Sequence, residues 1–512
     1  RRVGEKEWQQ AMPLRRVPAD TSIGTTPIFR WDNKHSGSIF NLRPDTEYEI
    51  NLKLSDPDGG AAEKTVRART RAVPRPMRDA PIKEANPRNF KEVAAAAVPG
   101  DIIQLTTGYY FDWEATRDGL PGKPIVIRAY DRSVFDSISL RDRKHVYLDG
   151  LTLYGSIDLL GGENLTVRRC QVEARFGIIA KRPPGAKNCY IADNTVTYVM
   201  PWESRGMGSG MATGGPACIG EGIEITGPGN VICYNYVKGY RDCISTMEDR
   251  NTGEQVCIDI YNNDVYLGAD DGIESDFCMH NCRIMYNRIT NSYMGVSSQP
   301  GLGGPTYFIR NAMYNIVHSP FKLHRHSKGD VALHNTAIKV GDGLCCRSSE
   351  GWSHALFRNN LMIGGIGGGF WGRYNAGDGL AIYLPGADET CDLDYDAVGT
   401  YHTAFEGLLG DVKFSSIEEL REKTSEKHAI RVDMTIFNGV AFPHPPVPER
   451  EPADLRPLIN TAVIDAGARL PNINDDYKGD APDIGCYEEG QKLPHYGPRA
   501  EGLDEMTPWL HK

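Results

Sequence analysis

Short runs in which apolar residues alternate with polar ones recur along most of the chain, a pattern typical of half-buried β-strands. Three early segments carry it clearly and are separated by turn residues: 98–105 (VPGDIIQL), 122–129 (GKPIVIRA) and 145–153 (HVYLDGLTL). No paired helical periodicity accompanies them. The pattern therefore predicts an all-β fold.

An internal repeat sets the architecture. An asparagine follows two positions after an apolar residue in five successive segments, at spacings of 25, 24, 24 and 24 residues: Asn262, Asn287, Asn311, Asn335 and Asn359. Asn235 and Asn194 extend the series backwards. A period of about 24 residues with short strands is typical of one coil of a parallel β-helix, in which aligned asparagines stack. A leucine-rich repeat would show its own signature, which is absent.

The first 77 residues show a different pattern, that of β-hairpins. Within them, Leu42-x-Pro44-x-Thr46-x-Tyr48 resembles the motif of fibronectin type III domains in which a corner tyrosine bonds back to the backbone. This resemblance implies a small N-terminal β-sandwich over residues 1–77, and a proline-rich linker at 73–76 follows it. We expect this module to be structural, because it carries no evident chemistry.

The remaining chain also resembles a known group. The three early segments and 481–488 (APDIGCYE) are similar to bacterial right-handed parallel β-helix proteins, which are rich in polysaccharide lyases and glycoside hydrolases. The resemblance implies a right-handed parallel β-helix over 78–385, and a secreted or periplasmic location. The repeat is lost after about residue 385, where Ser416 offers a capping-box start to a short helix. We expect 386–512 to cap the β-helix.

Charge and hydropathy exclude two classes of partner. The 512 residues include 57 Lys+Arg and 67 Asp+Glu, for a formal net charge of -10, and no dense basic run that would bind nucleic acid. No apolar stretch approaches the roughly 20 residues that a membrane-spanning helix needs. We therefore expect neither nucleic-acid binding nor membrane insertion, whereas the oligomeric state stays open.

Candidate chemistry lies on a second strand of each coil. Aligning these strands on an inward apolar residue places five side chains in one outward column: Glu224, Ser245, Glu274, Ser297 and His324. The next outward column holds Thr226, Met247, Asp276, Gln299 and His326. Because neighbouring strands lie about 4.8 Å apart, these groups should form one polar strip.

The densest point of the strip is 270–276 (DDGIESD), with four carboxylates in seven residues. Crowded carboxylates repel, so the pKa of one of them should rise, as a general acid requires. The plain alternative is a solvated Asp-Gly turn. We predict cleavage of glycosidic bonds by hydrolysis, with Asp271 and Glu274 in the acid/base pair and Asp270 and Asp242 in support. Substrate should be positioned by Glu224, Asp276, Gln299, Lys322, His324 and His326, with Trp202 and Arg205 on a rim.

Asp270-Asp271 is similar to the paired aspartates of polygalacturonase-like hydrolases, but the Gly-His-Gly and Arg-Ile-Lys elements of that family are absent. Two alternatives to hydrolysis stay open. A lyase acting on a uronate polysaccharide would instead need a base, for which Lys322, His324 and His326 are candidates. A non-catalytic glycan-binding solenoid is the second alternative. We predict no cofactor, although Asp270, Asp271, Glu274 and Asp276 offer oxygens that suit Ca²⁺.

Overall fold

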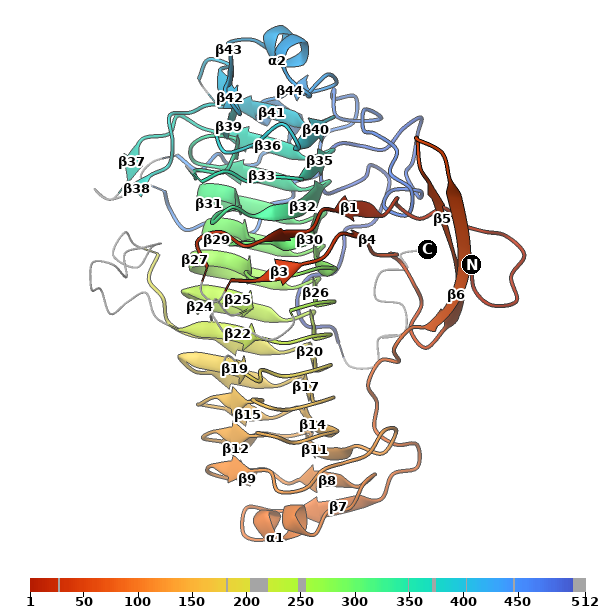
Figure 1. Cartoon of the computed structure of the whole chain (residues 1–512). Helices are drawn as coiled ribbons and strands as arrows, with labels where there is room; N and C mark the ends of the chain where they lie inside the picture. Colours follow the sequence, from red (N-terminus) through yellow and green to blue (C-terminus); the bar gives the residue numbers. More distant parts are fainter. Residues whose placement is uncertain are drawn as a thin grey trace.

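The protein is a right-handed parallel β-helix, which confirms the expected fold class (Figure 1). The computed structural model describes residues 1–25, 28–180, 183–202, 220–246, 255–348, 350–370, 374–401, 403–444 and 447–500. Two large parallel sheets run along the solenoid, and successive strands of each come from successive coils. Apolar side chains between the sheets, such as Ile127, Val167 and Ile244, form one continuous core.

Each coil contributes one strand to the first sheet. Its thirteen strands pair in parallel, as where Ile127 lies opposite Ile103 on one side and Leu148 on the other. In chain order the strands are β7 (Ile82–Ala85), β8 (Ile102–Leu105), β11 (Ile125–Ala129), β14 (Val146–Asp149), β17 (Thr166–Arg168), β20 (Tyr190–Ala192), β23 (Val231–Cys233), β26 (Asp259–Tyr261), β28 (Cys282–Met285), β30 (Leu302–Ile309), β32 (Lys328–Leu333), β35 (Leu356–Arg358) and β40 (Asp392–Asp394).

The second sheet of nineteen strands bends around a corner of the coil. Early coils contribute two short strands each, whereas β27, β29 and β31 run through both parts. The strands are β9 (Gly108–Tyr109), β10 (Trp113–Glu114), β12 (Ser133–Phe135), β13 (Ile138–Ser139), β15 (Thr152–Leu153), β16 (Ile157–Asp158), β18 (Gln171–Glu173), β19 (Phe176–Ala180), β21 (Thr195–Thr197), β22 (Glu221–Ile225), β24 (Tyr236–Tyr240), β25 (Asp242–Thr246), β27 (Asp264–Ser275), β29 (Arg288–Ser297), β31 (Ala312–Lys322), β33 (Thr336–Lys339), β36 (Leu361–Gly364), β41 (Ala397–Thr400) and β44 (Ile430–Arg431).

A ladder of buried asparagines joins the coils at the turn between the two sheets. Each side chain donates from Nδ2 to Oδ1 of the next coil at 2.9–3.0 Å, through Asn194, Asn235, Asn263, Asn287, Asn311, Asn335, Asn360 and finally Asp396. The prediction of Asn262 and Asn359 is wrong by one residue at each of these two coils. Those asparagines instead occupy the preceding position, where the backbone is left-handed with φ of 52° and 60°. Asparagine tolerates that conformation, so both members of each Asn-Asn pair are suited to the turn.

A short helix covers each end of the solenoid (Figure 1). Helix α1 (Phe90–Ala95) buries Phe90 against the first coils. Helix α2 (Ile417–Lys423) begins at the expected Ser416, whose side chain accepts a hydrogen bond from the Glu419 backbone N–H. A 3-10 turn (Met434–Ile436) follows. The helices shield strand edges that would otherwise pair with other chains.

The N-terminal residues form three antiparallel ribbons: β1 (Arg15–Val17) with β4 (Lys34–Ser36), β2 (Asp20–Thr21) with β3 (Arg30–Trp31), and β5 (Glu47–Ser55) with β6 (Ala61–Arg69). The Tyr48 hydroxyl accepts a hydrogen bond from the Arg43 backbone N–H at 2.8 Å, as a corner tyrosine would. Trp31 packs against Leu302 of the β-helix, so this part lies on the solenoid. The fibronectin type III resemblance and the domain limits at 77 and 385 stay predictions.

The loops of the last coils and the residues after them do more than cover one end of the solenoid. Small sheets form from β34 (Leu344–Cys345), β39 (Ile382–Leu384), β42 (Gly407–Leu409) and β43 (Val412–Phe414), and from β37 (Gly369–Phe370) with β38 (Tyr374–Asn375). The chain then runs back along the solenoid, where Arg499 donates two bonds of 2.8 Å to Asp193.

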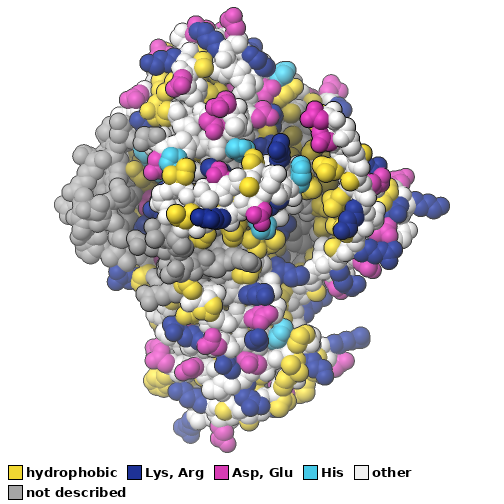
Figure 2. Space-filling view, in the orientation of Figure 1, with side chains coloured by type: hydrophobic (Ala, Val, Ile, Leu, Met, Phe, Trp, Pro, Cys, Tyr) yellow, Lys and Arg dark blue, Asp and Glu magenta, His cyan; other side chains and the backbone are white. Residues whose placement is uncertain are grey.

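Two further observations concern the chain as a whole. In the described residues no helix has the length and apolar character to cross a bilayer. Acidic and basic side chains intermingle on the face that Figure 2 shows.

Candidate active site

The predicted outward column exists, with one change at its last coil. Strand pairing aligns Glu224 with Ser245, Ser245 with Glu274, and Glu274 with Ser297, as expected. The next residue in the column is Lys322. The expected position of His324 is wrong because Phe321, and not Leu323, lies opposite Val296. This shift of two residues brings a lysine to the acidic coils.

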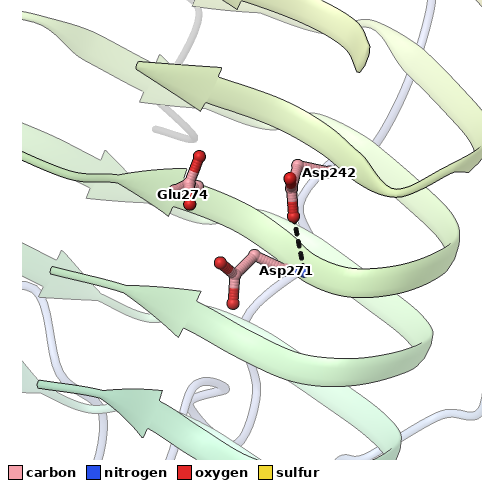
Figure 3. Close-up of side chains that lie close together, drawn as sticks. All are labelled: Asp242, Asp271 and Glu274. Carbon is pink, nitrogen blue, oxygen red and sulfur yellow. Dashed lines mark hydrogen bonds between the residues drawn. The ribbon is translucent and has the colours of Figure 1, made fainter. Parts of the chain in front are cut away.

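Three carboxylates converge at this point (Figure 3). Asp242 begins β25, and Asp271 and Glu274 lie near the end of β27; one oxygen of each lies within 4.8 Å of the others. Asp271 donates its backbone N–H to Asp242 Oδ1 at 2.8 Å. A register shift in the pairing of β27 with β29, between Gly268 and Asp271, is a local irregularity of the kind that redirects side chains next to functional sites.

Burial and mutual repulsion dominate the electrostatics of the carboxylates. Asp242, Asp271 and Glu274 are exposed by 2%, 0% and 5%. Burial, together with neighbouring carboxylates, raises the pKa of Asp242 and of Glu274 well above their usual values. Burial likewise raises the pKa of Asp271 to about 6, although Lys322 opposes this effect. Ionising all three carboxylates therefore costs much free energy unless cations lie beside them.

Two basic side chains of the protein partly balance this charge. Lys322 Nζ lies 2.7 Å from Asp271 Oδ2. Burial lowers the pKa of Lys322, but the carboxylates, chiefly Asp271, outweigh it and raise this pKa well above its usual value. Arg241 Nε lies 3.4 Å from Asp242 Oδ2, and Arg241 Nη2 lies 3.6 Å from Asp270 Oδ2. Arg241 was missed in the sequence, where only its place directly before Asp242 could have indicated a role.

The other predicted acidic and amide residues surround the cluster. Asp270 is 8% exposed and faces Arg241, so it supports the site from the side. Asp276 accepts a hydrogen bond of 2.6 Å from Ser297 Oγ and is fully buried. Glu224 lies two coils before Glu274 in the same column, and Gln299 lies just past the end of β29; both are buried.

The positions of His324 and His326 differ from the expectation that both face outward in the polar strip. Strand β31 ends at Lys322, and both Arg325 and His326 have left-handed backbones, so the alternation that was to turn both histidines outward does not apply. His324 is half-buried, and burial together with Lys322 lowers its pKa to about 4. His324 is therefore neutral at pH 7, while His326 lies in the turn beyond the strand.

The predicted rim is only partly described. Trp202 donates its indole N–H to the Val447 backbone oxygen at 3.0 Å and packs beside Met200 and Tyr266, which is a structural role. Arg205 and Met247 lie outside the described residues. No role on a sugar-binding rim is assigned to either.

The geometry departs from a simple pair of hydrolytic carboxylates. A glycosidase places two carboxyl groups about 5–5.5 Å or about 6.5–9.5 Å apart, one of them as the acid. Here a third carboxylate shares the cluster, and a lysine forms an ion pair within it. Such a site can bind a cation through hard oxygen ligands and can present an amine to a substrate. The fold and this site together define a parallel β-helix protein with a buried carboxylate–lysine centre.

Comparisons with solved structures found distant likenesses. The chain is similar to the pectate lyase Pel9A, with 15% identity over 80% of this chain and 97% of that chain, at a TM-score of 0.43. It is also similar to the PL6 family alginate lyase AlyGC, with 13% identity over 64% of this chain and 53% of that one, at a TM-score of 0.35. The PL6 family polysaccharide lyase Pedsa3628 from Pseudopedobacter saltans matches at 13% identity over 73% and 97% of the two chains, with a TM-score of 0.35. No family model and no curated protein sequence matches the chain.

Proposed function

We propose that this protein is a polysaccharide lyase that cleaves a uronate-containing polysaccharide by β-elimination. The observation that carries the proposal is the buried lysine among three carboxylates: Lys322 Nζ lies 2.7 Å from Asp271, and Asp242 and Glu274 complete the cluster. β-Elimination needs a base for the proton next to the uronate carboxylate and positive charge to neutralise that carboxylate. Both can be assembled here.

Lys322 is the proposed base. Its amine removes the proton from the carbon that bears the carboxylate; a carbon–carbon double bond then forms, and the bond to the glycosidic oxygen breaks. The leaving oxygen takes up a proton, so the products are a new reducing end and an unsaturated uronate. To act, the amine must separate from Asp271 and be unprotonated. We assign the binding of the substrate carboxylate to Arg241, which is partly exposed beside Asp242.

The three carboxylates fit a divalent cation. Each is buried and offers a hard oxygen, and Asp271 Oδ1 has no hydrogen-bond partner among the described residues. Ca²⁺ prefers such oxygens and fills its remaining positions with substrate or water. A cation held by Asp242, Asp271 and Glu274 would neutralise the uronate carboxylate and would offset the negative charge that keeps Lys322 protonated. The expected Ca²⁺ ligands thus change, since Asp270 and Asp276 lie outside this set.

The proposal differs from the expected hydrolysis, for which the third carboxylate and the lysine have no evident use. It keeps Asp271, Glu274 and Asp242 at the centre and moves the base to Lys322. We also propose export, because a polymeric substrate is encountered outside the cell.

The test incubates the protein with uronate polysaccharides such as pectate and alginate, and with neutral glycans, in the presence of CaCl₂. Reducing ends and the ultraviolet absorbance of unsaturated uronate are followed in the same samples. We expect both signals to rise together. In Lys322→Arg we expect kcat to fall by about 10²- to 10⁴-fold, because a guanidinium keeps the ion pair but does not deprotonate.

Lys83→Arg is the matched control, since Lys83 forms a comparable ion pair of 2.6 Å with Asp101 in the first coils. That variant should retain full activity, and thermal melts should show that both variants are folded. Reducing ends without absorbance would indicate hydrolysis instead. Undiminished elimination in Lys322→Arg would exclude Lys322 as the base.

A further inference from the structure

Among the described residues, exposed tyrosine and phenylalanine rings are concentrated in the first coils of the β-helix, whereas the one exposed tryptophan, Trp8, lies in the N-terminal region. The chain has 24 Tyr and 15 Phe, yet among the described residues only four of these are exposed: Tyr109 (42%), Phe111 (62%), Tyr130 (67%) and Tyr154 (49%). All four lie within 46 residues of one another in the sequence. Elsewhere in the described chain, tyrosine and phenylalanine rings are buried or half-buried. Solvent exposure of large rings at one place needs an explanation, because single exposed apolar residues are normally scattered.

These rings are held in place by their neighbours. Tyr109 and Phe111 pack edge to face at a centroid distance of 4.9 Å. The guanidinium of Arg128 lies 4.8 Å from the centroid of the Tyr130 ring. Arg132 donates a hydrogen bond of 2.7 Å to the Tyr154 hydroxyl. Rings that are fixed before binding lose little conformational entropy when a ligand covers them.

A groove of ≈ 520 Å³ adjoins Tyr130 and Tyr154 and continues across the next coils. Its floor carries Thr152, Gln171 and Thr195, which strand pairing places directly beside one another on β15, β18 and β21. Across these strands the three side chains span about 10 Å. Within the described part of the chain, no hydrogen bond engages their hydroxyl and amide groups. The groove thus presents a row of free donors and acceptors next to aromatic rings.

We infer that this aromatic groove, which lies on the coils before the catalytic cluster, binds a segment of a polysaccharide chain. Aromatic faces cover the C–H faces of sugar rings, while hydroxyl and amide groups pair with sugar hydroxyls. The groove walls carry Arg132 together with Asp131 and Glu173. One basic side chain beside two acidic ones does not suit nucleic acid, whose binding needs clustered basic side chains. The inference rests on the proposed function insofar as the bound chain is the polymer to be cleaved.

The groove belongs to other coils than the catalytic cluster. Its strands β15, β18 and β21 precede β25, β27 and β31, which carry Asp242, Asp271 and Lys322. A polymer could therefore be held by the aromatic groove while another segment is cut. Short oligosaccharides would occupy only one of the two sites.

The test is native gel electrophoresis through gels that contain pectate, alginate or a neutral glucan, without CaCl₂ and with EDTA so that turnover is suppressed. We expect at least one polysaccharide to retard the wild-type protein, and the double variant Tyr130→Ala, Tyr154→Ala to bind it about tenfold more weakly. Both rings are exposed, so the variant should fold normally. Ile459→Ala is the matched control, because Ile459 is 64% exposed and lies in the C-terminal region.

The outcomes separate this inference from the proposed function. Retardation that is lost only in the tyrosine variant supports the groove, even if no elimination product is ever found. Elimination with equal retardation of all three proteins would overturn the inference and leave the lyase intact. A wild-type protein that no polysaccharide retards would also overturn it, and would favour a protein partner for these rings. On short oligosaccharides, the tyrosine variant should keep its full turnover.

Discussion

Replacing Asn262 and Asn263 one at a time should show which of the two side chains belongs to the asparagine ladder and which only suits the turn. Both side chains are buried, by exposures of 2% and 0%, so burial alone does not distinguish them. Asn263 Nδ2 donates to the Ile232 oxygen and to Asn287 Oδ1, and its Oδ1 accepts from the backbone N–H and the Nδ2 of Asn235, all at 2.9–3.0 Å. Asn262 makes one side-chain bond, of 3.0 Å, to the His495 oxygen.

The expected magnitudes follow from these bonds. At about 1 kcal/mol for each net hydrogen bond, Asn263→Ala should lower the free energy of unfolding by about 4 kcal/mol, and it leaves buried groups of two coils without partners. Asn262→Gly should lower it by about 1 kcal/mol, because glycine keeps the left-handed backbone with φ of 52°.

Urea unfolding followed by far-ultraviolet circular dichroism measures both changes, with hydrogen exchange reporting whether coils next to residue 263 open first. Solenoids unfold locally, so protection should be lost mainly around the substituted coil. Equal destabilisation by the two variants would refute the assignment of the ladder to Asn263.

Further predictions concern the acidic cluster and the C-terminal segment. Without divalent cations, the melting temperature should fall as pH rises from about 4 to 7. The pKa of Asp271 is raised to about 6 in the folded protein, so the folded state holds this proton more tightly than the unfolded state does. The resulting stability is complete below the pKa that Asp271 has in the unfolded chain and is lost as pH rises through its pKa in the folded protein. A flat profile would contradict this. CaCl₂ should raise the melting temperature at pH 7, EDTA should reverse the rise, and Glu274→Gln should reduce it; an equal rise in that variant would place the cation elsewhere. Arg499→Ala should lower the free energy of unfolding by about 2–3 kcal/mol in urea, since the buried Asp193 loses one of its two arginine partners and keeps Arg168; an unchanged midpoint would show that the Arg499–Asp193 pair does not stabilise the fold.

The fold could be predicted because the sequence pattern that produces it repeats at a constant spacing. Strands and turns recur at the length of one coil, and a repeat of asparagines marks the turn that every coil shares. The error at Asn262 arose where two asparagines adjoin, because both are compatible with the corner and only pairing between strands decides which one enters the ladder. Sequence spacing cannot resolve a shift of one residue there.

The carboxylates of the cluster could be aligned from the sequence, whereas the position of its lysine was missed. Asp242, Asp271 and Glu274 could be aligned because each coil has an isoleucine in the inward position. At the last coil, Phe321 and Leu323 are both apolar and two residues apart, so either choice preserves the alternation of faces. Strand pairing selects Phe321 and with it Lys322. Arg241 could not be found by pattern, since its role follows from proximity to acids of two coils.

The register of the coils also determines which insertions and deletions this site would tolerate in evolution or design. Asp242, Asp271 and Lys322 are brought together only because their strands stack in order, on β25, β27 and β31. Insertion of a whole coil before β22 would lengthen the solenoid and leave the carboxylate–lysine cluster unaltered. Loss of the coil that carries β29 would instead remove the spacer between acids and lysine. The coil, and not the residue, is therefore the unit by which this protein can lengthen its surface while the carboxylate–lysine cluster stays intact.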